Sequence, residues 1–313
     1  MSSKDAQNAQ PAIPPALGIL IGILAVSAAS IFIRLAQREA PSLVIAAYRL
    51  TIASLILAPL AWLRYRPELR TLTRREIALA GLSGLFLGLH FATWITSLAY
   101  TTVASSVVLV STAPLLVGAL SPLVLRESPR RALWLGLIVA LAGAALIGLS
   151  DTCALAAGRV ACPPLAEFLR GRAFVGDALA FGGAVSGAGY FLIGRKLRAR
   201  LSLIPYITLV YGTAAAFLLA AMVAAGHSPT GYSPQTYLWF LLLALVPQLL
   251  GHSAFNWALR YLPATFVTLT TLGEPIGSTV LAYFLLRETP GPLKLLGGGL
   301  ILLGIALASR SAR

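Results

Sequence analysis

The chain is built from long apolar segments separated by short polar connections. Apolar runs of roughly 20 residues are long enough to cross the ~30 Å hydrocarbon core of a bilayer as helices. Strands of a membrane barrel would alternate apolar and polar residues, whereas these runs are continuous. The pattern predicts ten spans, near residues 15–35, 42–62, 77–99, 104–125, 132–150, 176–194, 203–225, 237–259, 264–286 and 293–309. The expected fold class is therefore an all-α integral membrane protein with ten transmembrane helices.

The last five segments repeat the first five. The motif Arg126-Glu127-Ser128-Pro129 recurs as Arg287-Glu288-Thr289-Pro290, at an offset of 161 residues. At the same offset, Gly136 matches Gly297 and Gly143 matches Gly304, so the chain is a fused duplication. Since five is an odd number, the two halves must cross the membrane in opposite directions. Inverted repeats of this kind are typical of secondary transporters, which bind substrate near the midplane between the halves.

These boundaries divide the chain into five parts. We expect a cytoplasmic tail (1–14), a first repeat (15–150), an external loop between the repeats (151–175), a second repeat (176–309) and a short cytoplasmic tail (310–313). The apolar run that opens the first repeat is too long for a cleaved signal peptide, and no small-residue cleavage site follows it.

Composition and charge agree with this assignment. The chain is 58% hydrophobic and only 11% charged, whereas a soluble protein carries about a quarter charged residues. With the N-terminus inside, 16 of the 24 Lys and Arg residues fall on the cytoplasmic side and 7 on the outer side. Both termini are therefore predicted to be cytoplasmic. The net charge of +14 is explained by this topology and by anionic lipid headgroups, so no nucleic-acid partner is expected.

The two cysteines, Cys153 and Cys162, both lie in the predicted external loop. In an oxidising compartment they can form a disulfide, and the alternative is two free thiols.

Two ionisable residues fall inside predicted spans, where charge is costly and usually functional. Arg49 lies about seven residues inside the second span, roughly 10 Å from the membrane surface at 1.5 Å per residue. It can bind a substrate carboxylate, or it can hold helices together by capping carbonyls. Glu274 directly precedes Pro275 in the ninth span, where it can receive an ammonium group or a coupling proton, or stabilise a kink.

Polar side chains also gather on single faces of two predicted helices. His90 and Trp94 share a face of the third span, and Gln248, His252 and Asn256 share a face of the eighth, which Pro247 is expected to bend. We therefore expect His90, Trp94, Gln248, His252 and Asn256 to contact substrate, although an ordinary interhelical hydrogen bond is an equal alternative for either histidine. No further metal-ligating residues accompany the two histidines at ligand spacing, so no metal is expected.

Three tyrosines of the sixth and seventh spans, Tyr190, Tyr206 and Tyr211, can line the same cavity. The alternative, favoured for tyrosines near helix ends, is an interfacial belt. Pro114 and Pro275 are equivalent in the repeat and are candidate hinges of the fourth and ninth helices, with a static packing kink as the alternative.

Several of these features resemble the drug/metabolite transporter superfamily in its EamA-type branch, over about residues 15–309. The residues that carry the resemblance are Pro41 and Arg49, the run Trp94–Tyr100 leading into Ala104-Ser105, Pro114, Leu125-Arg126-Glu127, Gly176-Asp177, Glu274-Pro275 and Leu286-Arg287-Glu288. The resemblance implies a ten-helix carrier of two inverted repeats in a bacterial inner membrane. It also implies that the fifth and tenth helices are peripheral, and that bacterial exporters of amino acids and related metabolites are the nearest role.

The sequence thus predicts a secondary transporter, most plainly an exporter, of small neutral or amphiphilic metabolites with amino acids favoured. Arg49 would attract the carboxylate and Glu274 the amino group or a proton. Purines, sugars and cationic drugs remain alternative substrates, and a channel or an integral-membrane enzyme acting on lipids are more distant alternatives. No G-x-x-x-x-G-K-[ST] loop occurs, so gradients would drive transport and no cofactor is expected. The oligomeric state is left open, with a monomer among the options.

Overall fold

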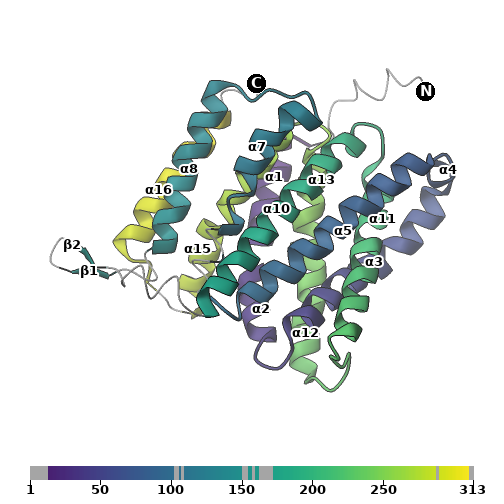
Figure 1. Cartoon of the computed structure of the whole chain (residues 1–313), viewed down its shortest axis with the longest axis horizontal. Coiled ribbons are helices and arrows are strands. Elements are labelled where there is room, and N and C mark those ends of the chain that lie inside the picture. Colours follow the sequence, from purple (N-terminus) through teal and green to yellow (C-terminus); the bar gives the residue numbers. More distant parts are fainter. Residues whose placement is uncertain are drawn as a thin grey trace.

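The computed structural model of the chain describes residues 13–101, 106, 109–149, 154–156, 159–161, 172–286 and 289–309. These residues form a helical bundle (Figure 1). The helices of the first half are α1 (Pro15–Val26), α2 (Ala29–Ala36), α3 (Ser42–Arg64), α4 (Arg66–Arg70), α5 (Arg74–Ser97), α7 (Ala113–Val124) and α8 (Arg131–Leu149). Those of the second half are α10 (Arg172–Arg198), α11 (Leu203–Ala224), α12 (Pro234–Leu243), η1 (Ala244–His252), α13 (Ser253–Ala258), α14 (Ala264–Thr270), η2 (Thr271–Gly273), α15 (Glu274–Leu286) and α16 (Pro292–Ser309).

Many of these helices have the length and composition of membrane spans. Within the described ranges, five stretches are long and apolar enough to cross a bilayer: Pro15–Ala36, Ser42–Arg64, Arg74–Ser97, Leu203–Ala224 and Pro234–Ala258. The outer surfaces of the bundle carry exposed leucines and aromatic residues, such as Leu63 and Phe284, as a lipid-facing surface does. The predicted all-α membrane class is therefore confirmed.

Several spans are interrupted rather than continuous. The first breaks at Ser27 and Ala28, between α1 and α2. The eighth changes from α-helix to the π-helix η1, which contains Pro247, and the ninth passes through the 3-10 turn η2 before Glu274. A proline removes one backbone donor from the helical ladder, and π-turns commonly occur where a helix absorbs such a defect. These interruptions lie in the interior of the bundle, since Ser27, Gln248 and Gly273 are all buried.

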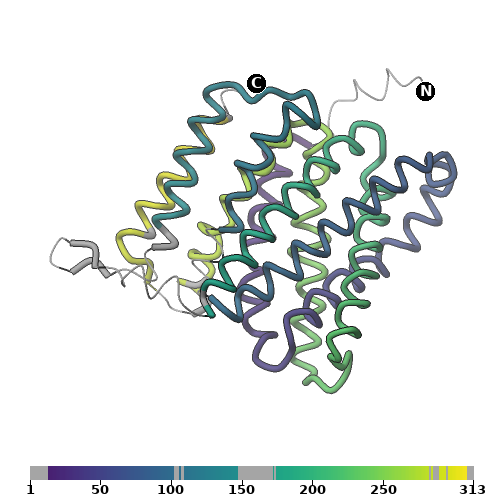
Figure 2. Tube along the Cα trace, in the orientation of Figure 1, coloured from purple at the N-terminus to yellow at the C-terminus, as the bar shows by residue number. Residues whose placement is uncertain are grey.

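Helices α8 and α16 form a separate pair at one edge of the bundle, as the tubes in Figure 2 show. A Cβ atom added at Gly136 would lie 2.5 Å from the carbonyl oxygen of Gly304, and one added at Gly143 would lie 2.5 Å from that of Gly297. Only glycine permits so close an approach of two backbones. The repeat equates Gly136 with Gly297 and Gly143 with Gly304, so exchanging the halves exchanges the two contacts.

The other close pairs also pack through glycine. Helix α5 lies against α10 and α11, and α3 lies against α11. Gly84 approaches the Val210 carbonyl of α11, while Gly183 and Gly187 of α10 approach Trp94 and His90 of α5. Small residues here bring the polar faces of neighbouring helices together at van der Waals distance.

A short two-stranded hairpin lies between the two halves. Strands β1 (Ala154–Ala156) and β2 (Arg159–Ala161) pair antiparallel, with Ala154 opposite Ala161. The cysteines of the proposed disulfide, Cys153 and Cys162, lie outside the described residues, as do Arg287 and Glu288 of the repeated motif.

Candidate functional site

Arg49 lies at the centre of the bundle and is completely buried, with 0% of its surface exposed. Its Nε donates a hydrogen bond of 2.8 Å to Oε1 of Gln248, which belongs to the other half of the chain. Its guanidinium also lies 4.1 Å from the ring centroid of Phe91 on α5. A cation in hydrocarbon needs such partners, because the desolvation of an isolated charge costs several kcal/mol.

Gln248 and His252 lie on the π-helix η1, which contains Pro247 and packs against α3. The ring of His252 contacts Phe91 of α5. Phe255 of α13 packs against Gly22 of α1, where an added Cβ would lie 3.1 Å from the Phe255 ring.

The buried centre leaves several polar atoms without a partner. Donor atoms without a hydrogen bond are Nη1 of Arg49, Nε2 of Gln248 and Nε1 of Trp94. The side-chain oxygen of Asn256 and Nδ1 of His252 are likewise buried and unpaired. Because leaving a buried donor or acceptor unsatisfied costs about 1–3 kcal/mol each, such a concentration indicates a place where a ligand supplies the missing partners.

Aromatic rings form one wall beside these atoms. His90 stacks on Trp94 with a centroid distance of 5.9 Å, and Phe91 contacts His252 edge-on at 5.2 Å. His90 Nδ1 lies 2.8 Å from the Gly183 carbonyl, so this histidine is held by the backbone of α10. His90 thus makes the interhelical hydrogen bond that was its alternative role, while Trp94 keeps a free donor.

Asn256 connects the site to two tyrosines. Its amide nitrogen donates to the hydroxyls of Tyr190 and Tyr211, the latter at 3.4 Å, and to the His252 carbonyl at 2.8 Å. Tyr190, Tyr206 and Tyr211 are all buried in the bundle. The interfacial-belt alternative for these tyrosines is therefore wrong, because they are hydrogen-bonded inside the protein.

Glu274 begins α15 directly after the 3-10 turn η2. The Ser27 hydroxyl donates to the Glu274 carbonyl at 3.5 Å, and Ser278 donates to the Ser27 carbonyl at 2.9 Å, so the breaks of the first and ninth spans meet here. No ion pair within 4.0 Å joins Glu274 and Arg49. A ligand with both an anionic and a cationic group can bridge such a separation.

The two predicted hinge residues occupy matching places. Pro114 lies in the first turn of α7 and Pro275 in the first turn of α15, each directly after an interruption of its span. A proline is tolerated there because the first-turn N–H groups have no partner within the helix. Their role as hinges stays a prediction.

Two neighbours of the site were not among its predicted residues. Phe91 lies against the Arg49 guanidinium, and Arg198 donates from Nε to the Asn256 carbonyl at 3.0 Å. Arg198 is only 2% exposed although it was assigned to a polar connection. Arg198 closely follows Arg195 and Lys196, so nothing in the sequence indicates that it is buried. Within the described ranges no group of three metal-ligating side chains occurs near His90 and His252.

Two pockets lie at opposite ends of α5. One, of about 760 Å³, is lined by the α2–α3 connection and by Thr96–Tyr100 at the end of α5. The other, of about 700 Å³, is lined by the last turns of α7 and α10. The beginning of α5 is tied to that second end by the ion pair between Glu76 and Arg200 at 2.6 Å. The buried Arg49 centre lies in the bundle interior between them.

Comparison with known proteins extends these observations. The sequence model of the EamA-like transporter family matches the chain twice, over residues 13–149 and 174–310. An uncharacterized transporter of Archaeoglobus fulgidus is 24% identical over 283 residues, covering 89% of this chain and 91% of that protein. The uncharacterized transporter YwfM of Bacillus subtilis is 23% identical over 286 residues, covering 89% of this chain and 88% of that protein.

A solved crystal structure shares the fold, with a TM-score of 0.72 and 19% identity over 96% of this chain and 97% of the other. The two family matches lie one in each half of the chain, and α8 and α16 belong to different matches. The chain therefore belongs to the EamA-like transporter family, within the drug/metabolite transporter superfamily.

Proposed function

We propose that the chain is a secondary transporter that exports small neutral or amphiphilic metabolites, with amino acids as its substrate class, by alternating access. The carrying observation is the set of unpaired donors in the buried centre, on Arg49, Gln248 and Trp94. Three unpaired donors, one of them on a guanidinium, suit a carboxylate, which offers about four lone-pair sites. Glu274, a carboxylate at the interruption between η2 and α15, suits the amino group or a coupling proton.

Ten spans in two inverted repeats account for the described helices. On this proposal α1–α2, α12–η1–α13 and α14–η2–α15 are single interrupted spans, and the first half then has the same number of spans as the second. The reciprocal glycine contacts of α8 and α16 support the inverted relation. In inverted-repeat carriers, rocking of one repeat against the other exposes a midplane site to each side in turn.

The two pockets at opposite ends of α5 support alternating access. A ligand at Arg49 would leave through one pocket or the other, and the completely buried arginine corresponds to a closed centre. The export direction follows from the resemblance to bacterial exporters, and the membrane is proposed to be a bacterial inner membrane with cytoplasmic termini.

The proposal is tested with purified protein in proteoliposomes, by counterflow of radiolabelled amino acids. Saturable uptake that unlabelled amino acids compete for is expected. Arg49→Ala should abolish it, whereas Arg64→Ala, an exposed arginine at the end of the same helix, should not. Failure of every amino acid to be transported or to compete would refute the substrate class. Release from preloaded cells tests the direction.

The aromatic wall favours one competing substrate class. Trp94, Phe91 and His90 can stack on a flat base, so a purine carrier is the second candidate. Competition by adenine or guanine in the same assay, with none by any amino acid, would select it.

A further inference from the structure

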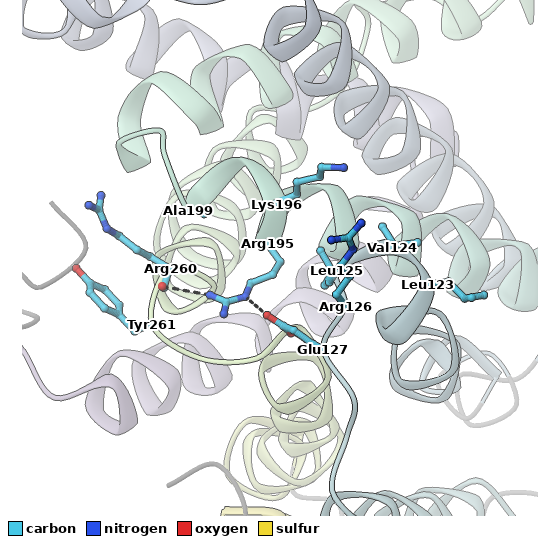
Figure 3. Close-up of a pocket in the computed structure, with 10 residues that line it drawn as sticks. All are labelled: Leu123, Val124, Leu125, Arg126, Glu127, Arg195, Lys196, Ala199, Arg260 and Tyr261. Atoms are coloured by element: carbon cyan, nitrogen blue, oxygen red, sulfur yellow. Dashed lines mark hydrogen bonds and ion pairs between the residues drawn. The ribbon is translucent and has the colours of Figure 1, made fainter. Parts of the chain in front are cut away.

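A second site lies at the end of the bundle away from the Arg49 centre. The pocket of about 700 Å³ is formed where α7 ends, where α10 ends and where α13 leads into α14. Its lining residues, drawn in Figure 3, are Leu123, Val124, Leu125, Arg126, Glu127, Arg195, Lys196, Ala199, Arg260 and Tyr261. Four of them are basic and one is acidic, so the pocket is strongly positive.

The single acid is already engaged inside the protein. Glu127 accepts from Arg195 Nε at 2.6 Å and from the Ala264 backbone N–H at 3.4 Å. Arg195 uses Nη1 for the carbonyls of Leu259 and Arg260, at 2.7 and 3.2 Å. Glu127 and Arg195 therefore neutralise each other and fix the floor of the pocket. Two further basic residues of the lining are Arg126 and Lys196.

Arg126 and Lys196 present their charges to the opening. Both side chains are exposed, and neither makes a hydrogen bond or ion pair with a described residue. Figure 3 shows them on the same side of the Arg195–Glu127 pair. Two exposed cations that line one pocket repel each other, so an anion between them would relieve that repulsion.

The backbone of Arg126 strengthens this assignment. Its φ of 59° makes it a left-handed residue, and it is the only non-glycine residue with positive φ among those the structure describes. It ends α7, where glycine is the usual residue because other side chains cost roughly 1–2 kcal/mol in this conformation. Glycine would adopt this conformation without strain, so an arginine at this position indicates that its guanidinium has a role.

The rim of the pocket is apolar on the side of α7. Leu123 is 81% exposed and Val124 is 41% exposed, directly before the basic cluster. Large exposed aliphatic side chains next to cations match a phospholipid, with acyl chains against the leucine and a phosphate among the guanidinium and ammonium groups. Positive residues dominate this end of the bundle, which the sequence predicts to be cytoplasmic, and the cytoplasmic leaflet is the anionic one.

We propose that this pocket binds the phosphate headgroup of an anionic phospholipid between Arg126 and Lys196, with its chains along Leu123 and Val124. The pocket is also one of the two exits proposed above, but none of its lining residues belongs to the Arg49 centre, and lipid binding does not depend on which substrate is carried. It would anchor the ends of α7 and α10, one helix from each half, to the same lipid.

Arg126→Gly gives a sharp test, because glycine adopts positive φ freely while the guanidinium is removed. The full chain in detergent is titrated with phosphatidylglycerol and, separately, with phosphatidylcholine, and bound lipids are counted by native mass spectrometry. Wild type should bind phosphatidylglycerol more tightly, and Arg126→Gly and Lys196→Ala should each weaken that binding about fivefold, equivalent to ~1 kcal/mol for one basic residue. Without lipid, Arg126→Gly should unfold at the wild-type temperature or above it.

The control is Arg75→Ala, which removes an exposed arginine at the beginning of α5, on the same end of the bundle but outside the pocket. It should bind phosphatidylglycerol as wild type does. Equal binding of the two lipids, or an equal loss in Arg75→Ala and Arg126→Gly, would overturn the proposal. Inorganic phosphate that displaces phosphatidylglycerol at millimolar concentration would also overturn it, in favour of a soluble phosphate ligand.

Discussion

The α8–α16 pair and the Arg49 centre are the two contrasting regions of this protein. In the pair, each half supplies one helix and the glycine contacts are reciprocal, so the repeat is preserved down to single residues. In the centre, Arg49 and Gln248 bridge the halves, but the positions equivalent to Arg49, near residues 208–210, hold no charge. The same two halves are thus symmetric at the edge and asymmetric in the middle.

This difference separates architecture from chemistry. Reciprocal glycine contacts need only small residues at matching places, which a duplication supplies twice. A site for a ligand with unlike ends needs unlike groups, and Arg49 and Glu274 come from different halves. The loss of symmetry is therefore expected where a ligand binds.

Disrupting the symmetric pair should have the largest effect. Gly136→Leu would drive a side chain into the Gly304 carbonyl and into Ala308, whose Cβ lies 2.9 Å from the added Cβ. Overpacking of this kind costs typically 1–3 kcal/mol, and here backbone faces backbone, so we expect loss of folded protein. Gly299→Leu, on the open side of α16 with nothing within 4 Å, is the control. The folded fraction by size-exclusion chromatography is the measurement, and equal yields would contradict the pair's role.

Substitution of Arg49 should affect transport more than folding. Arg49→Lys keeps the charge but cannot donate to Gln248 and to a ligand with the same fork geometry. Loss of a hydrogen bond to a charged group is worth about 1.5–3 kcal/mol, so KM should rise about 10- to 100-fold. Proteoliposome kinetics with the transported substrate measure it. An unchanged KM together with a lower unfolding temperature would assign Arg49 a purely structural role.

Glu274→Gln distinguishes the two roles proposed for that carboxylate. If Glu274 carries a coupling proton, the variant should lose the response to an imposed pH gradient while counterflow continues. If it receives the amino group, KM in counterflow should rise about tenfold, corresponding to ~1.4 kcal/mol. Normal kinetics and normal coupling would leave Glu274 as a support for the break beside Ser27.

Sequence predicted the scaffold better than the site, for a physical reason. Span length and the 161-residue repeat follow from local composition, so the helices and the glycine pair were accessible. Arg49, Gln248, Trp94, His252 and Asn256 were also found, because polar residues in apolar runs are conspicuous. Whether these residues bind substrate stays a prediction.

The parts that sequence missed depend on long-range packing. The eighth span contains a π-helix around Pro247, and no local sequence pattern specifies a π-helix. Phe91 looked like any apolar residue until Arg49 was found above its ring. Arg198 looked like a loop cation because its acceptor, the Asn256 carbonyl, lies on another helix.

The smallest effect on stability is expected at two junctions between the halves. They occupy equivalent places in the two repeats, but one is a set of hydrogen bonds to a carboxylate and the other is an ion pair. At one end of the bundle, Glu39 accepts from the Ser233 N–H at 3.0 Å and from Thr236 at 2.8 Å, at the start of α12. At the other end, Arg200 pairs with Glu76 at the start of α5. Glu39 follows the first span of the first half and contacts the start of the third span of the second half. Arg200 follows the first span of the second half and contacts the start of the third span of the first half.

Hydrogen bonds from the Ser233 backbone and then from Thr236 hold the pKa of Glu39 below its usual value. A carboxyl group with a lowered pKa in the folded protein contributes stability above its ordinary pKa, and this contribution is lost as the pH falls through the lowered value. Glu39→Gln should therefore unfold at a slightly lower temperature than wild type at neutral pH, and the gap should close on acidification. Arg200→Ala removes the ion pair at the other junction but keeps the Glu76 carboxylate that caps α5. Its unfolding temperature should be lower than that of wild type, and the difference should shrink as salt is added. Thermal unfolding at several pH and salt values measures both differences in unfolding temperature. If the difference between Glu39→Gln and wild type widened in acid, the ionised carboxylate would not be what holds the junction.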